Sequence, residues 1–137
     1  MHKWISQLQA ACESQLRRVL NARLSLPFEE SRLPLSDILE SIRSIERFVE
    51  GMDLDAFIAD DRTQAAVERK LLIISEAAVR LKDAAESVCP GVPWRDIRGI
   101  GNWLRHQYDR VDLETIWNTI HDDLPPLKVA VEKALRP

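Results

Sequence analysis

The sequence predicts an all-α protein: an up-and-down bundle of about four to five helices with an extra helix at the N-terminus. Apolar residues recur at intervals of three and four along most of the 137 residues, as on one face of an amphipathic helix. No segment of four to eight residues combines strand-type alternation with flanking turns. The helical patterns are joined by short connections, which favour antiparallel neighbours in a bundle.

The composition is typical of a soluble globular domain, with 45% apolar and 30% charged residues and a formal net charge of -3. No apolar run approaches the roughly 20 residues that span a bilayer, and the chain opens without a signal-peptide pattern. We therefore expect a cytoplasmic protein with no membrane partner. Cys12 and Cys89 lie far apart without metal-binding companions, so both are expected to be reduced, with no metal or other cofactor.

Residues 1–33 are expected to form an amphipathic helical arm, and residues 34–137 a separate helical bundle domain. Pro27 and Pro34 flank an acidic, turn-like stretch, Glu29–Ser31, which is expected to separate the two. The arm packs either on its own bundle or on a partner subunit, and both alternatives stand. Its packing residues are expected to be Trp4, Leu8, Leu16 and Leu20.

The bundle is expected to open with a helix capped by Ser36. Asp53 then opens a short helix that ends near Ala59. A longer pattern starts near Asp61 and draws one apolar stripe over about six turns, until Cys89–Gly91 stops it. The stripe consists of Val67, Leu71, Ile74, Ala78, Leu81, Ala85 and Val88.

Pro93 is expected to start the next helix, which runs through Trp94 toward Tyr108 with Gly99 and Gly101 in its middle. Each glycine weakens a helix by roughly 1 kcal/mol relative to alanine. Such glycines indicate either close helix packing or a backbone that a ligand approaches. The sequence leaves both explanations open.

Asp112 is expected to cap a helix whose apolar residues continue to Ile120. Near the end of that helix, His121 is expected at the surface or as a C-terminal cap. Two prolines, Pro125-Pro126, either kink the helix or begin the terminal segment Leu127–Leu135.

The segment from Arg95 to Arg110 carries the residue types best suited to chemistry. It holds four arginines against two aspartates and lies between acidic flanks. It also contains His106, the one histidine suited to proton transfer. Imidazole exchanges a proton near pH 7, whereas arginine stays cationic and suits phosphate, so the combination indicates phosphodiester chemistry.

Helical spacing predicts the neighbours of His106. On an ideal helix its face is shared by residues one, two and three turns earlier. These are Asn102, Gly99 and Arg95. Arg105 points elsewhere, and Arg98 lies about 80° round and about 12 Å along the axis. The alternative explanation is a histidine on a solvated face that complements the helix dipole.

Four motifs follow one another in this region: Trp94–Ile97, Gly99–Tyr108, Val111–Trp117 and Asp123–Pro125. Together they resemble the HepT-like branch of the HEPN superfamily. The resemblance extends over residues 34–135 and leaves the first 33 residues outside it. It implies a small helical bundle that forms a homodimer, with a metal-independent RNase site in a cleft between the subunits.

The same resemblance implies the toxin of a two-gene system, inactivated when a minimal nucleotidyltransferase antitoxin transfers AMP onto a tyrosine. Carried over by position, His106 is the catalytic histidine, Asn102 the polar residue one turn before it and Tyr108 the modified tyrosine. Cations for RNA binding are expected at Arg95, Arg98, Arg105 and Arg110.

One position departs from the family pattern, which has an arginine separated from the histidine by four to six residues. Those positions hold Gly101, Ile100 and Gly99. We expect Arg98 or Arg105 to substitute as a catalytic cation through altered geometry, with Arg98 the more important. The alternative is a catalytically inactive HEPN-like subunit that binds nucleotide or RNA and serves as a scaffold for the nucleotidyltransferase.

Overall fold

The computed structural model describes residues 7, 9–15, 27–106 and 112–137, and helices are the only regular structure in these ranges. The chain divides into two compact units, residues 1–30 and 31–137. In the first unit, residues 9–15 are helical and exposed. The packing residues expected for the arm, Trp4, Leu8, Leu16 and Leu20, lie outside the described residues. None of the described helices is long and apolar enough to cross a membrane.

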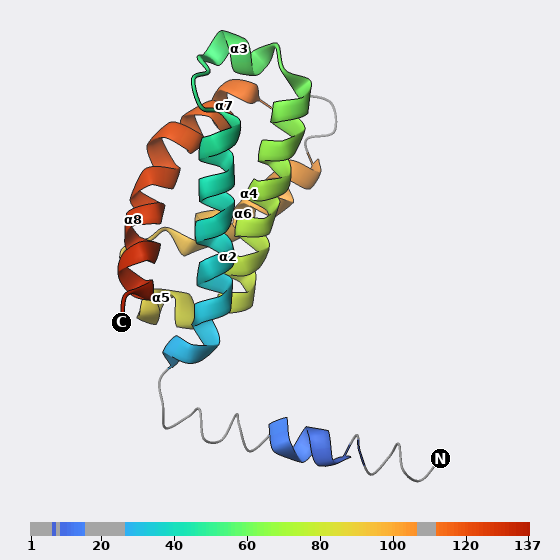
Figure 1. The fold of residues 1–137 in the computed structure, drawn as a ribbon, viewed down its shortest axis with the longest axis vertical. Helices are drawn as coiled ribbons and strands as arrows, with labels where there is room; N and C mark the ends of the chain where they lie inside the picture. Colours follow the sequence, from blue (N-terminus) through green and yellow to red (C-terminus); the bar gives the residue numbers. More distant parts are fainter. Residues whose placement is uncertain (1–6, 8, 16–26, 107–111) are drawn as a thin grey trace. The chain divides into compact units, whose positions relative to one another are not determined.

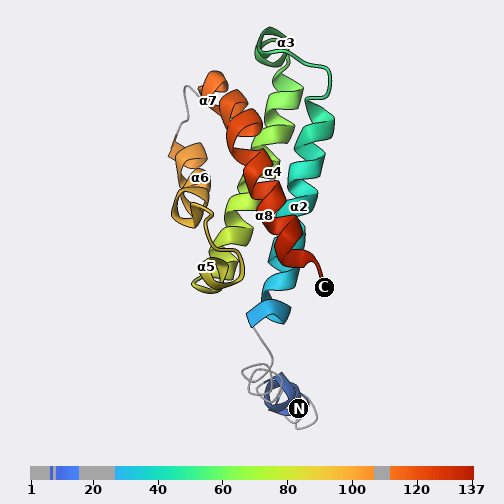
Figure 2. The same cartoon turned by 90° about the vertical axis from the view of Figure 1, so that its left-hand side faces the viewer.

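Four longer helices alternate in direction and confirm the predicted all-α, up-and-down bundle (Figures 1 and 2). They are α2 (Pro27–Phe48), α4 (Asp61–Leu81), α6 (Trp94–His106) and α8 (Leu124–Leu135). Shorter elements connect them: α3 (Leu54–Ile58), α5 (Ala84–Val88), α7 (Leu113–Asn118) and the π-helical turn η1 (Thr119–Asp123).

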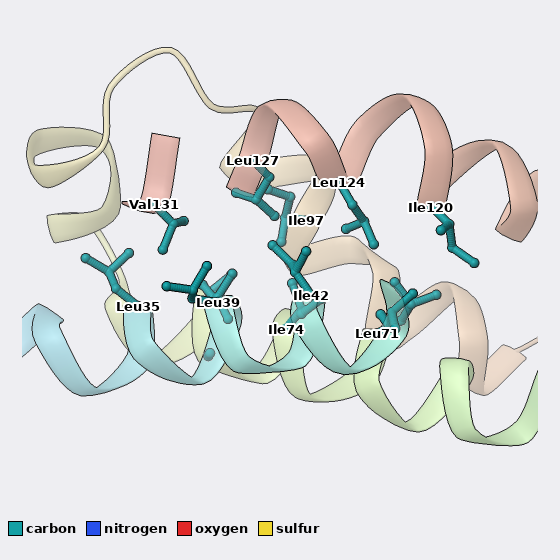
Figure 3. Close-up of a cluster of buried hydrophobic side chains, with 14 of the residues drawn as sticks. Leu35, Leu39, Ile42, Leu71, Ile74, Ile97, Ile120, Leu124, Leu127 and Val131 are labelled. Atoms are coloured by element: carbon teal, nitrogen blue, oxygen red, sulfur yellow. The ribbon is translucent and has the colours of Figure 1, made fainter. Parts of the chain in front are cut away.

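The core lies between these helices and includes most of the apolar stripe that the sequence pattern predicts for residues 67–88 (Figure 3). Ile42 of α2, Ile74 of α4 and Val131 of α8 are each fully buried. Each such side chain stabilises the fold by roughly 1.5–3 kcal/mol. Trp94 is also buried, and its indole Nε1 donates a hydrogen bond to the Cys89 carbonyl at 2.9 Å. Burial raises the pKa of the Cys89 thiol, which is free and packs in the core as expected.

The beginning of α2 differs from the expectation. The helix starts at Pro27, so Glu29–Ser31 is helical, and the predictions of a separating turn there and of a cap at Ser36 are wrong. Pro34 lies inside the helix, where its ring removes the N–H that would bond the carbonyl of Glu30. The buried Leu35 and its neighbours on the same face anchor this part of α2 to the core.

The long apolar stripe is split between two helices rather than carried by one. Although its residues are buried or partly buried as predicted, α4 ends at Leu81 and Lys82 adopts a positive φ of 50°. Arg98 accounts for this end, because its guanidinium donates to the carbonyls of Ala78 at 3.3 Å and Lys82 at 2.7 Å. It also pairs with Glu86 of α5 at 2.9 Å. A cation from α6 thus binds carbonyls at the end of α4, where the helix dipole is negative. The Lys82 carbonyl also accepts a hydrogen bond from the Ala85 N–H at 3.3 Å.

The predicted aspartate caps at Asp53 and Asp112 are present, and Asp60 caps α4 in the same way. Hydrogen bonds from the Thr63 side chain and backbone lower the pKa of Asp60, and Thr115 lowers the pKa of Asp112 likewise. These carboxylates stabilise the fold while ionised. Their contribution to the free energy of unfolding is fully present at a pH above the ordinary carboxyl pKa. It is lost as the pH falls through the lowered pKa of the folded state.

The segment around Pro125-Pro126 combines the two predicted alternatives. The prolines lie in the first turn of α8, yet the chain reaches them from α7 without leaving a helical path. Because prolines have no N–H, they cannot bond the carbonyls four residues earlier, those of His121 and Asp122. The backbone hydrogen bonds of the helix shift instead to a wider, π-helical turn, in which the Leu124 N–H donates to the Thr119 carbonyl.

Replacing Arg98 by alanine is expected to lower the free energy of unfolding by about 2 kcal/mol, because charged hydrogen bonds to helix carbonyls are lost. Arg95→Ala, on the exposed face of the same helix, serves as the control and should change it by less than about 0.5 kcal/mol. Urea unfolding followed by circular dichroism measures both. Equal midpoints for the two variants would contradict the capping role of Arg98.

Candidate functional site

One face of α6 is buried and the opposite face is exposed. Trp94, Ile97 and Gly101 face the core, and α6 packs mainly against α4. The exposed residues include the four that helical spacing places together: Arg95, Gly99, Asn102 and His106. His106 therefore lies exposed in the last turn of α6, with the Asn102 carboxamide one turn before it.

Ser75 of α4 is hydrogen-bonded to the backbone of α6 at two points. Its hydroxyl accepts a hydrogen bond from the Gly101 N–H at 3.0 Å and donates one to the Arg98 carbonyl at 2.9 Å. A Cβ added to Gly101 would lie only 3.0 Å from Ser75 Oγ and 3.3 Å from Leu72 Cδ1. Close helix packing thus explains Gly101, and a side chain at this position requires α4 to yield.

Arg105 lies beside this contact. Its side chain is exposed, and one guanidinium nitrogen comes within 3.5 Å of the place where a Cβ of Gly101 would lie. The side chain thus extends back along α6 toward the preceding turn. Within the described part of the chain, Arg105 forms no hydrogen bond or ion pair. Its cation is therefore available to an anionic ligand.

Arg98 is placed differently. Its side chain is only 26% exposed and is held by α4 and Glu86, so the structure gives it a role in the fold. To reach a phosphate beside His106 it would have to leave these partners. Asn102 and His106 therefore share the exposed face of α6, whereas the Arg105 guanidinium lies beside Gly101 and Arg98 is held on the side of α4.

Tyr108 and Arg110 lie outside the described residues, so their expected roles stay predictions. His121 is at the surface as expected, with Nδ1 2.9 Å from the Trp117 carbonyl and its ring against the Trp117 indole. Among the residues that the structure describes, no cluster of His, Cys, Asp or Glu is arranged to hold a metal ion.

The sequence interpretation missed Ser75. The available signal was a hydroxyl residue directly after Ile74 in the predicted apolar stripe. Such a side chain in a buried helix face needs a hydrogen-bond partner, and here α6 supplies two.

Comparison with known proteins agrees with the family resemblance of the sequence motifs. The family described as "Ribonuclease HepT-like" matches residues 38–134. A protein named "Probable ribonuclease HepT" from Thermococcus cleftensis is 37% identical over 99 residues, 72% of this chain and 90% of the relative. "Putative RNase MJ1380" from Methanocaldococcus jannaschii is 35% identical over 98 residues, with the same two coverages. No solved structure gives a significant match to this chain.

The two glycines of α6 are expected to respond oppositely to alanine. Gly99→Ala meets no atom within 4 Å and should raise the free energy of unfolding by about 0.5–1 kcal/mol through helix propensity. Gly101→Ala presses on Ser75 and Leu72 and should lower it by about 1–2 kcal/mol. Urea denaturation compares the variants under identical conditions. A shift of the same sign in both would refute this account of the α4–α6 contact.

Proposed function

Because the chain belongs to the ribonuclease HepT-like family of the HEPN superfamily, we propose that it is a metal-independent endoribonuclease, the cytoplasmic toxin of a toxin–antitoxin pair. One observation supports this most strongly. His106 is exposed in the last turn of α6, with Asn102 one turn earlier on the same face and Arg105 directly before it in the sequence, inside the region that matches the family.

The proposed reaction is cleavage of an RNA phosphodiester by its own ribose. The 2′-oxygen attacks phosphorus and the bond to the 5′-oxygen breaks, which leaves a cyclic phosphate. His106 removes the 2′-hydroxyl proton or protonates the departing 5′-oxygen, and water takes or supplies the other proton. Arg105 balances the negative charge that develops on the phosphoryl oxygens, and the Asn102 carboxamide positions the same phosphate. The scheme needs no metal ion.

The remaining arginines contribute to RNA binding in this proposal. Arg95 and Arg110 bind flanking phosphates, and a homodimer places two such surfaces around one cleft. Arg98 adds to the positive potential of the segment while it holds the end of α4. Arg105 is the preferred catalytic cation because its guanidinium has no competing partner among the described residues.

Regulation follows from the same family membership. The partner is a minimal nucleotidyltransferase that transfers AMP onto Tyr108, two residues after His106. The added nucleotide is a bulky anion, and it competes with the RNA phosphate for His106, Arg105 and Arg110. Modification then suppresses RNA binding and cleavage together.

A second candidate function is favoured by Gly101. The family arginine is absent there, and Ser75, Leu72 and Arg105 crowd the space in which its side chain would start. The chain would then be an inactive HEPN-like subunit that binds nucleotide or RNA and scaffolds its nucleotidyltransferase. Expression without the partner gene separates the two functions: growth arrest that depends on His106 supports the nuclease, and harmless expression supports the scaffold.

His106→Ala is expected to reduce RNA cleavage in the presence of EDTA by about 10²- to 10⁴-fold with the fold intact, because proton transfer is lost. Arg105→Ala should reduce it by about 10²-fold through lost charge stabilisation. His121→Ala, at another exposed histidine, is the matched control and should leave cleavage unchanged.

Cleavage of a labelled RNA by the purified variants measures these effects. Undiminished cleavage in His106→Ala would refute the mechanism. Arg98→Ala is assayed beside Arg105→Ala at a temperature where both are folded. A greater loss in Arg98→Ala would restore Arg98 as the principal cation.

Co-expression with the cognate nucleotidyltransferase is expected to add the mass of AMP to the chain at Tyr108. Intact-mass and peptide mass spectrometry detect the adduct, and it should be absent in Tyr108→Phe. If the partner neutralises the toxin without any adduct, inhibition is by steric binding and the proposed modification is wrong.

A further inference from the structure

A groove of about 370 Å³ runs along α6, between this helix and the segment formed by α7 and η1. Its polar and aromatic lining comes from both sides: Arg95, Asp96 and Trp103 on α6, and Thr115 and Thr119 opposite. Gly99, Leu71, Ile100 and Ile116 complete the lining. Arg95 and Gly99 also belong to the exposed face that ends at His106. The groove and the proposed catalytic residues therefore share one helix.

Gly99 is the feature that the fold itself does not explain. A Cβ at this position would meet no atom within 4 Å, so the helix gains no packing contact from the missing side chain. A glycine in the middle of a helix is nevertheless unfavourable. Gly101, two residues further on, has a packing reason that Gly99 lacks. Because Gly99 has no side chain, the groove is open down to the helix backbone at this position.

The groups around this open stretch suit one nucleotide. Trp103 is partly buried and offers an aromatic surface on which a base can stack. Arg95 supplies a cation for a phosphate, and the Asp96 carboxylate accepts hydrogen bonds from base amino groups. The Thr115 hydroxyl donates its proton to the Asp112 carboxylate, and the Thr119 hydroxyl donates its proton to the Thr115 carbonyl. Toward a ligand, both hydroxyl oxygens therefore act as hydrogen-bond acceptors.

The distance along the helix agrees with a single RNA strand. Trp103 precedes His106 by three residues, a rise of about 4.5 Å along the axis, so a stacked base lies close to the proposed cleavage point. We propose that this groove is a nucleobase subsite, which holds the base and phosphate of a nucleotide next to the bond cleaved at His106. The proposal rests on the ribonuclease function proposed above.

A second copy of the chain is the competing occupant. The groove also has an apolar part, formed by Leu71, Ile100 and Ile116, against which the flat face of a base can pack. The guanidinium, the carboxylate and the two hydroxyls beside it favour the nucleotide over a second copy. An interface between two copies would bury these charged groups. The buried cores of protein–protein interfaces generally contain few charged residues.

Gly99→Leu tests the subsite directly, because its side chain projects into open space in the fold and obstructs the groove. Ala65→Leu, at an exposed position of α4, is the matched control for adding the same side chain to a helix surface. Binding of a short 2′-O-methyl RNA, which the proposed reaction cannot cleave, is measured by fluorescence anisotropy with the full-length protein. Gly99→Leu should weaken binding about tenfold, and Ala65→Leu should leave it unchanged.

Trp103→Phe and Trp103→Leu supply an independent measurement. The phenylalanine retains an aromatic face and should bind RNA nearly as the wild type does, whereas the leucine should lose about tenfold. Thermal unfolding and sedimentation velocity are recorded for every variant. Unchanged RNA affinity in Gly99→Leu overturns the subsite, and a change of its oligomeric state assigns the groove to a second copy instead.

The two proposals fail in different ways. If the wild type cleaves RNA and Gly99→Leu binds and cleaves equally well, the subsite is wrong and the ribonuclease function stands. If the wild type binds the RNA through the groove but His106→Ala has no effect on cleavage, the catalytic assignment is wrong and the groove stands only as a nucleotide-binding site.

Discussion

The contact between Ser75 and Gly101 determines which face α6 presents to solvent. One hydroxyl accepts from the Gly101 N–H and donates to the Arg98 carbonyl, so it bonds the α6 backbone at two points. These bonds, together with the buried Trp94, fix the rotation of α6 about its axis. The exposed histidine face is thus a consequence of packing on the opposite side of the helix.

Arg98 and Arg105 differ in what surrounds them, although both belong to the same basic segment. The guanidinium of Arg98 completes the end of α4 and leaves little of its side chain exposed. Arg105 reaches back over Gly101 and keeps its charge free of partners in the described chain. A count of basic residues cannot separate these roles, because the difference lies in the carbonyls and carboxylates that each side chain meets.

The parts of the fold that depend on local spacing could be predicted from the sequence. Apolar periodicity and capping aspartates give the starts of α4 and α7, because these signals act within one or two turns. The break at Lys82 could not be predicted, since it is stabilised by Arg98, 16 residues further along the chain. The helical path through Pro34 was missed for a related reason: the core contacts of Leu35 and its neighbours outweigh a local helix breaker.

In the candidate site, too, some features could be predicted from local spacing and others could not. Rotation by 100° per residue predicts that Asn102 and His106 share a face, and both are exposed. The different reasons for Gly99 and Gly101 could not be inferred, because they depend on what lies opposite each glycine.

The Ser75 hydroxyl also makes positions 75 and 101 interdependent in evolution. An arginine that arose at position 101 alone would place its Cβ 3.0 Å from the serine oxygen, so its cost in stability depends on the residue at position 75. With glycine at 101, the serine makes two hydrogen bonds that a smaller apolar residue would forfeit. A chain with both Ser75 and Gly101 therefore loses stability when it regains the arginine, and the loss is smaller when position 75 changes with it.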